Sequence, residues 1–207
     1  GLLGHRIVGQ IAQSYLTPKA QAEISKILGH TNIAMSATWL DFVKSDTTSL
    51  YKYLSTWHYV DIEGGLSDAG VLAFLAAATT VDAYTKINFM VKELKNKNLE
   101  ADKKLLYLRA LIHIVGDIHQ PLHVGHPIDL GGNKIKVMWF NDQSNLHRVW
   151  DDDLISSQKL SYTEYAASIN FVTAQQKKIW QSQPLSQWIL ETYQDAQKDY
   201  AGLKTDE

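Results

Sequence analysis

The chain has 207 residues, of which 45% are hydrophobic and 20% are charged. This composition predicts one globular domain spanning residues 1–207, and it excludes a disordered chain, a collagen-like chain and a disulfide-stapled miniprotein. A net charge of −2 predicts no general electrostatic attraction to nucleic acid or to an anionic membrane. Because the chain has no cysteine, thiolate metal sites and cysteine nucleophiles are also excluded.

Apolar residues recur mostly at helical spacing along the chain. Ser67 is expected to cap the fourth helix, and Pro121 to end the fifth. In chain order, we expect helices over residues 5–16, 18–28, 36–44, 70–94, 103–118, 161–178 and 186–203. The predicted fold class is therefore mainly α.

Two segments are expected to be non-helical. Gly131, Gly132 and Asn133 form a turn signal, and the alternation over residues 134–139 predicts a short strand or β-hairpin. The segment Trp57–Asp61 is expected to be extended, which would put Tyr59 and Asp61 on one face and His58 on the other.

No apolar run approaches the ~18 residues that a membrane-spanning helix requires. The first ten residues lack the charged region and the long apolar region of a signal peptide. We therefore expect either a cytosolic protein or a mature, processed chain without a membrane span.

Histidine placement is the most informative feature of the sequence. Five of the eight histidines fall between residues 113 and 147. His113 and Asp117 are four residues apart in a predicted helix, so they share one face, and imidazole with carboxylate is a zinc-type ligand pair. The helix is apolar, and a buried carboxylate needs a partner that a cation would supply.

A second pair, His147 and Asp151, repeats this spacing, and His123 follows the helix break at Pro121. One such pair alone is weak, because a helix cap or a surface hydrogen bond explains it equally well. Two pairs together with His123, in a chain without cysteine, favour a metal site. Asp41 lies in an apolar helix, but an ion pair with Lys44 is an equally good interpretation.

The candidate ligands are too numerous for one zinc ion, which usually takes four. They are His5, Asp41, His58, His113, Asp117, His123, His147 and Asp151. A multinuclear site follows, and its mixture of imidazoles and carboxylates suits zinc better than magnesium. Paired metals clamp a phosphoryl group, so the predicted reaction class is phosphoester hydrolysis.

Together these motifs resemble those of the zinc-dependent single-strand nucleases of the S1/P1 type, in the same order and spacing. The motifs are residues 1–5, 39–41, 57–61, 113–123, 131–133 and 145–151. The resemblance runs from residue 1 to about 155. It implies a single helical domain related in fold to zinc phospholipase C, with three zinc ions.

The resemblance also implies a ligand set for each ion. The first zinc would be held by Asp41, His58, His113 and Asp117. Asp117 would bridge to a second zinc held by His5 and the N-terminus, and His123, His147 and Asp151 would hold the third. A water bridging the paired zincs would attack phosphorus, and the remaining zinc would stabilise the leaving 3′ oxygen.

The implied activity is hydrolysis of single-stranded DNA and RNA, and of 3′-nucleotides, to 5′-phosphorylated products. Tyr59 would stack on a base and Asp61 would hydrogen-bond to it, with Asn133 at the same pocket. Lys44 occupies a position where the family often has Arg, and would contact the phosphate. His119 would orient a metal ligand from outside the coordination shell, whereas His30 and His126 would be surface residues.

One departure concerns the N-terminus. Mature members of the family open with a Trp whose α-amino and carbonyl groups chelate zinc, whereas this sequence opens with Gly1. Without that Trp, the zinc at His5 would lose part of its chelation. A processed N-terminus that serves as a ligand also implies export, so we expect a secreted or periplasmic protein that is monomeric, with no obligate protein partner.

Two other functions remain open. A zinc phospholipase C shares the fold, but its last ligand pair is His with Glu rather than His147 with Asp151. A helical protein that binds metal without catalysis is the second alternative.

Overall fold

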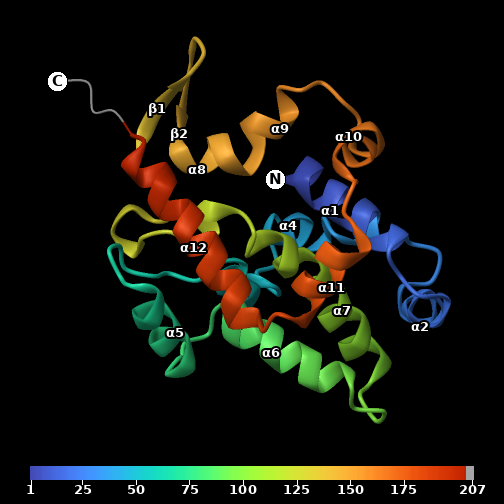
Figure 1. Ribbon diagram of the computed structural model, residues 1–207. Helices are drawn as coiled ribbons and strands as arrows, with labels where there is room; N and C mark the ends of the chain where they lie inside the picture. The colour runs from blue at the N-terminus through green and yellow to red at the C-terminus, as the bar shows by residue number, and fades with distance from the viewer. Residues whose placement is uncertain (204–207) are drawn as a thin grey trace.

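A computed structural model describes residues 1–203 as a set of helices with one two-stranded antiparallel hairpin (Figure 1). The α-helices are α1 Leu2–Ser14, α2 Pro18–Leu28, α3 Ile33–Ser36, α4 Trp39–Lys44, α5 Asp68–Ala76, α6 Ala83–Leu94, α7 Ala101–Asp117, α8 Leu146–Arg148, α9 Leu154–Ser156, α10 Tyr162–Ile169, α11 Ala174–Ser182 and α12 Leu185–Ala201. Between them lie short 3₁₀ segments η1 Lys52–His58, η2 Pro121–Val124 and η3 Pro127–Asp129, and the π-helical turn η4 Val149–Asp153. The predicted mainly α fold with one short hairpin is confirmed.

Helix α7 lies at the centre of the helical packing. It contacts α1, α2, α3, α4, α6 and η1. It buries Leu108 against α2 and, on another face, Ala110 and Ile114 in the main core; the face of Ala110 and Ile114 also carries His113 and Asp117 in the last two turns. The helix thereby delivers an imidazole and a carboxylate into the protein interior, as their spacing predicts.

The main core lies beneath α4, α5, α6, α7 and α12, and includes Leu40, Leu75, Ile114 and Ile189. A smaller cluster around Leu28 packs α2 against α7. Helix α12 runs across one side of the molecule and contacts α5, α6 and η2 (red in Figure 1). It therefore fixes η2, which carries His123, relative to the core.

The hairpin pairs β1 Lys136–Trp139 with β2 Asp142–Asn145, with Lys136 opposite Asn145 and Trp139 opposite Asp142. It projects from the body of the molecule (Figure 1). Asn145 ends β2 and also caps α8, because its side chain accepts a hydrogen bond from the Arg148 amide at 2.8 Å. The strand therefore leads directly into the turn that carries His147.

Two of the predicted helices are wrong in extent, because each is two helices: residues 70–94 divide into α5 and α6, and residues 161–178 into α10 and α11. Both breaks are followed by N-terminal capping boxes, formed by Asp82 with Thr85 and by Thr173 with Gln176. The helix predicted over residues 36–44 is α4, which begins at Trp39, and the short α3 before it was not predicted. Ser67 caps α5 as predicted, by accepting a hydrogen bond from the Gly70 amide.

The segment Trp57–Asp61 is only partly extended. Trp57 and His58 belong to η1, whose apolar side is buried, and the extended conformation begins at Tyr59. From there the expected alternation holds, since Tyr59 and Asp61 are exposed while Val60 and Ile62 are buried. Within residues 1–203 no helix combines the length and the apolar composition needed to cross a lipid bilayer.

Candidate metal centre

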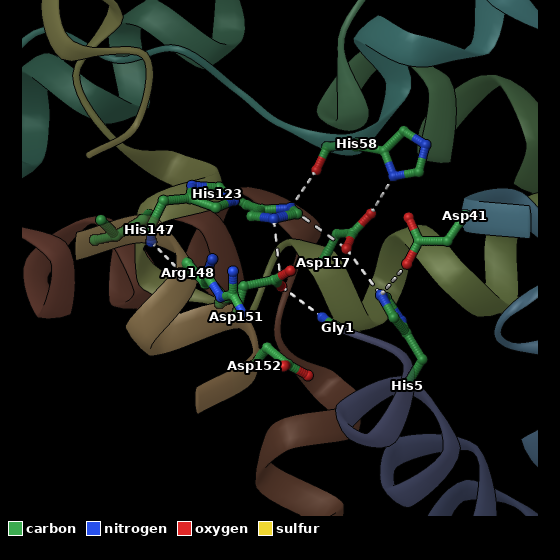
Figure 2. Close-up of polar contacts among 12 residues, drawn as sticks. Gly1, His5, Asp41, His58, Asp117, His123, His147, Arg148, Asp151 and Asp152 are labelled. Atoms are coloured by element: carbon green, nitrogen blue, oxygen red, sulfur yellow. Dashed lines mark hydrogen bonds and ion pairs between the residues drawn. The ribbon is translucent and has the colours of Figure 1, made fainter. Parts of the chain in front are cut away.

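The eight predicted ligands come from seven elements and converge in the folded chain; Figure 2 labels all of them except His113. They are His5 on α1, Asp41 on α4, His58 at the end of η1, His113 and Asp117 on α7, His123 on η2, His147 on α8 and Asp151 on η4. They form three groups of possible metal ligands: His5, His113 and Asp117; Asp41, His58 and His113; and His123, His147 and Asp151. In each group the ligand atoms lie within 4.8 Å of one another.

Asp117 belongs to the first group, lies beside a histidine of each of the three groups, and is only 2% exposed. Its Oδ2 lies 2.9 Å from His58 Nδ1 and 3.1 Å from His113 Nε2. Its Oδ1 lies 3.2 Å from His5 Nε2 and 3.3 Å from His123 Nδ1. One carboxylate thus faces four imidazoles, which come from α1, η1, α7 and η2.

Asp41 closes this side of the centre from α4. Its Oδ1 lies 3.7 Å from His113 Nε2, and its Oδ2 lies 3.9 Å from His5 Nε2. Lys44, one turn later, places its Nζ 3.6 Å from Asp41 Oδ1. Both sequence interpretations of Asp41 therefore hold geometrically, since it faces the imidazoles and also pairs with Lys44.

The third group lies on the other side of Asp117. The imidazoles of His123 and His147 stack with their centroids 4.9 Å apart, and His123 Nε2 is 3.7 Å from Asp151 Oδ1. The Gly1 amino group lies 2.7 Å from the same Asp151 oxygen. Gly1 O also accepts a hydrogen bond from the His5 amide at 3.2 Å, and the expected role of the N-terminus at the zinc of His5 stays a prediction.

Backbone carbonyls fix the orientation of three of the rings. The Nδ1 atoms of His113, His123 and His147 donate to Ala37 O at 2.6 Å, His58 O at 2.8 Å and Gly131 O at 2.8 Å, respectively. A donated Nδ1–H leaves Nε2 as the free lone pair, and this is how proteins orient metal-binding histidines. The donor set therefore fits zinc in number, chemical type and tautomer.

Three of the candidate ligands have pKa shifts that favour the protonation state in which they bind a cation: ionised Asp117, and neutral His58 and His123. Burial alone would raise the pKa of Asp117, but the neighbouring His123 and His113 outweigh it and hold that pKa well below its usual range. Burial lowers the pKa of His58, and lowers that of His123 to about 4. For His113 burial opposes protonation, but Asp117 and Asp41 outweigh it and raise the pKa.

A cavity of about 380 Å³ opens beside the centre, and its wall includes His58, His123 and His147. The remaining predicted substrate-binding residues, Lys44, Tyr59, Asp61 and Asn133, line the same cavity. Burial, together with the nearby carboxylates of Asp82, Asp129 and Glu63, raises the pKa of Asp61. Metal-ligand candidates and base-binding candidates therefore share one cavity.

Three histidines lie outside the ligand groups, and His30 is exposed, as expected. His119 is exposed, bonds Val115 O through Nδ1 at 2.7 Å and lies against Trp188, so its predicted role in orienting a ligand stays a prediction. His126 was expected at the surface, but it is half-buried, with its ring stacked on Tyr200. A second cavity of about 520 Å³, bordered by His5, was not predicted, because packing between α1, η4 and α10 creates it.

Comparison with known proteins agrees with this geometry. The S1/P1 nuclease family model matches residues 1–205. Endonuclease 3 of Arabidopsis thaliana is 33% identical over 168 residues, which cover 78% of this chain and 56% of that protein. Nuclease P1 of Penicillium citrinum is 30% identical over 172 residues (79% and 63%), and nuclease S1 of Aspergillus oryzae is 29% identical over 161 residues (74% and 54%).

This chain thus spans between about half and two thirds of the length of the curated relatives that it matches. The family match, by contrast, extends over nearly all of the chain itself and includes every residue of the three ligand groups. The chain belongs to the S1/P1 nuclease family.

Proposed function

We propose that this protein is a zinc-dependent phosphodiesterase that hydrolyses single-stranded DNA and RNA, and 3′-nucleotides, to 5′-phosphorylated products. One observation carries the proposal: His58, His123 and His147 belong to the ligand groups and also line the cavity that contains Tyr59 and Asp61. A nucleotide base in that cavity would place its phosphate next to the centre.

Three zinc ions would be held by the ligand groups described above. Asp117 would be shared between the ion at His5 and the ion at Asp41, His58 and His113. When bound, such ions supply Lewis-acid stabilisation of the phosphoryl oxygens and a more acidic water. The chain itself contributes the fixed positions of these ligands and a buried environment around Asp117.

Other side chains of the cavity would bind the nucleotide. Tyr59 is 38% exposed and presents an aromatic ring for stacking, which tolerates every base. Asp61, on the same face, would hydrogen-bond to a base edge, and Asn133 lines the same cavity. The Lys44 ammonium would offset phosphate charge, but without the planar bidentate fork of an Arg.

The main alternative is a zinc phospholipase C, which uses a related fold and similar ligands. Tyr59 and Asp61 favour the nuclease, because a stacking ring paired with a carboxylate suits a nucleobase rather than a lipid. A metal-binding protein without catalysis is the second alternative, and it predicts zinc binding without turnover.

The test is an assay of the zinc-loaded protein on single-stranded DNA, RNA, duplex DNA and a lecithin emulsion. We expect cleavage of both single-stranded substrates, loss of activity with a chelator and recovery with zinc. Tyr59→Ala should raise KM by about 5- to 100-fold, because stacking contributes about 1–3 kcal/mol per base. Tyr53→Ala is the matched control, since Tyr53 is an exposed ring on the same segment outside the cavity.

Each alternative has its own outcome in this assay. Turnover of lecithin with no cleavage of oligonucleotides would establish the phospholipase. Zinc binding with no turnover of any substrate would establish the binding protein. An equal effect of the two Tyr substitutions would remove Tyr59 from the base-binding role.

A further inference from the structure

The loop His126–Asn133 forms one wall of the cavity and has an unusual backbone. Leu130, Gly131 and Gly132 have φ values of 56°, 59° and 78°, so three consecutive residues are left-handed. This conformation is unfavourable for Leu130, because its Cβ crowds the following carbonyl. A loop of this kind keeps its shape only where other contacts hold it.

The shape of this loop matters for both parts of the site. Gly131 O accepts the hydrogen bond from His147 Nδ1 at 2.8 Å, so the loop sets the direction of the His147 ring. Leu130, Gly131 and Asn133 also line the cavity. A shift of the loop would therefore move a metal-ligand candidate and the nucleotide-binding wall together.

Two side chains of α12, far along the sequence, contact the loop. Within the loop Gln197 bonds only His126 Nε2, at 3.0 Å, whereas Tyr200 reaches both His126 and Asp129. The Tyr200 hydroxyl, in the last turn of α12, donates to Asp129 Oδ1 at 2.9 Å and accepts from the His126 amide at 3.2 Å. The same Asp129 oxygen accepts from the Gly132 amide at 2.6 Å. The Tyr200 ring also stacks on His126, with centroids 3.9 Å apart and planes at 6°.

The hydrogen bond from the Tyr200 hydroxyl to Asp129 has the strength needed to hold the loop in place. A phenol that donates to a carboxylate makes a charge-assisted hydrogen bond, which is stronger than a neutral one. Burial, together with the adjacent Asp129 and Asp61 carboxylates, raises the pKa of Tyr200, so the hydroxyl keeps its proton. Asp129 thereby joins α12 on one side to the Gly132 amide on the other.

We propose that Tyr200 is a positioning residue: through Asp129 it holds the loop His126–Asn133, and through Gly131 it holds the ring of His147. The link to zinc and substrate rests on the function proposed above. The link to the loop rests on the hydrogen bonds alone.

Tyr200→Phe tests this proposal, because it removes only the hydroxyl. Tyr193→Phe is a matched control on the same helix, where the hydroxyl also makes two bonds, accepting from the Leu66 amide and donating to Glu63 O, both at 2.9 Å. Tyr193 therefore reports the cost of losing a buried phenol hydroxyl from α12 that bonds no residue of the loop.

The first measurement is amide hydrogen exchange of the zinc-free protein, which depends on neither metal nor activity. We expect the Gly131 and Gly132 amides to exchange at least about 10-fold faster in Tyr200→Phe, and at the wild-type rate in Tyr193→Phe. Asp129→Ala should have the same effect. The double variant should show little beyond Asp129→Ala, because both changes break one link.

The second measurement is zinc competition with a chelator, together with steady-state kinetics at saturating zinc. We expect Tyr200→Phe to bind the zinc at His147 about 10-fold less tightly than the wild type. This is the typical effect of disturbing a hydrogen bond that orients a metal ligand. KM should rise several-fold while kcat changes little once zinc is saturating.

Wild-type exchange at Gly131 and Gly132 in Tyr200→Phe, or equal effects of the two Phe variants on zinc affinity, would overturn the proposal. A wild-type protein that neither binds zinc nor cleaves nucleic acid would instead refute the proposed function. In that case the exchange data still decide whether Tyr200 holds the loop.

Discussion

At the scale of single residues, Asp117 has the greatest influence on the site. A carboxylate that is 2% exposed would be costly to ionise if it were unpaired. The imidazoles of His5, His58, His113 and His123 surround it at 2.9–3.3 Å, and they keep its pKa well below the usual range. The negative charge that a shared metal ligand needs is therefore present in the folded protein.

We expect Asp117→Asn to abolish hydrolysis, because an amide cannot bridge two cations as a carboxylate does. The loss in kcat should be at least about 100-fold. Residues that only hydrogen-bond to a metal ligand cost up to about 100-fold when they are replaced, and a ligand itself should cost more. The zinc content should also fall. Kinetics at saturating zinc, with the bound zinc determined by elemental analysis, measure both quantities.

Asp152→Asn is the matched control, since Asp152 lies next to the site in the chain but bonds Ser156 and belongs to none of the ligand groups. It should retain near-wild-type kcat and zinc content. Full activity of Asp117→Asn would contradict the bridging role, and equal losses in the two variants would show a general effect of lost charge.

The sequence predicts the identity of these residues better than their orientation. Spacings of four residues place His113 with Asp117 and His147 with Asp151. The carbonyls that select the ring nitrogens, such as Ala37 O for His113, are 76 residues away and become partners only in the fold. His126 was misjudged for the same reason, because Tyr200, which covers it, lies 74 residues later.

At the scale of elements, the helices that carry ligands are positioned by close contacts. Helix α1 packs on α3 at Gly9, where an added Cβ would lie 2.7 Å from Ala34 Cα and 2.9 Å from Ala34 N. Since these are backbone atoms, they cannot rotate away. Gly9 thus lets α1 approach closely, and His5 lies one turn before it.

Gly9→Ala should destabilise the protein by about 1–3 kcal/mol, the usual cost of overpacking, although Ala favours a helix by about 1 kcal/mol relative to Gly. Gly70→Ala in α5 is the control, because its nearest neighbour is Ser67 Oγ at 3.4 Å and the helix preference should dominate there. Urea unfolding measures both. A gain in stability in Gly9→Ala would show that α1 does not need this close contact.

The helix breaks show which features of an element are local. The helix over residues 18–28 and the cap at Ser67 depend on neighbouring residues, and these predictions were confirmed. The break between α5 and α6 was missed because residues 70–94 are rich in helix-favouring Ala and Leu. In the structure α5 ends at Ala76, and the Asp82–Thr85 capping box begins α6, where Ala83 is fully buried.

At the scale of the whole molecule, the centre joins elements from α1 to η4, so its assembly requires the complete packing of α7 against its neighbours. Placing His123 on η2 depends on α12, which begins at Leu185. No local pattern encodes that arrangement. The order of the family's motifs predicts that the metal ligands come together. The distances between them and the contact of Tyr200 with the loop can be known only from the folded structure.

Such a buried centre makes global stability depend on pH when zinc is absent. His123 titrates near 6.5 in an unfolded chain, but burial lowers its pKa to about 4 in the fold. Between these values the unfolded chain takes up a proton that the folded protein does not, so the free energy of unfolding decreases as the pH falls from 6.5 to 4. His58 acts in the same direction, whereas the raised pKa of His113 opposes it.

We expect His123→Gln to remove its share of this acid sensitivity. Between pH 6.5 and pH 4 the wild type should lose about 3 kcal/mol more unfolding free energy than the variant. This value follows from about 1.4 kcal/mol per pKa unit, and it makes the variant relatively more stable at low pH. Urea titrations with a chelator present, followed by Trp fluorescence, measure it. His30→Gln, at an exposed histidine, should parallel the wild type. If the stability curve of His123→Gln runs parallel to that of the wild type, His123 has the same pKa in the folded and the unfolded protein. That result would contradict a buried, neutral His123 whose Nδ1–H donates to His58 O beside Asp117.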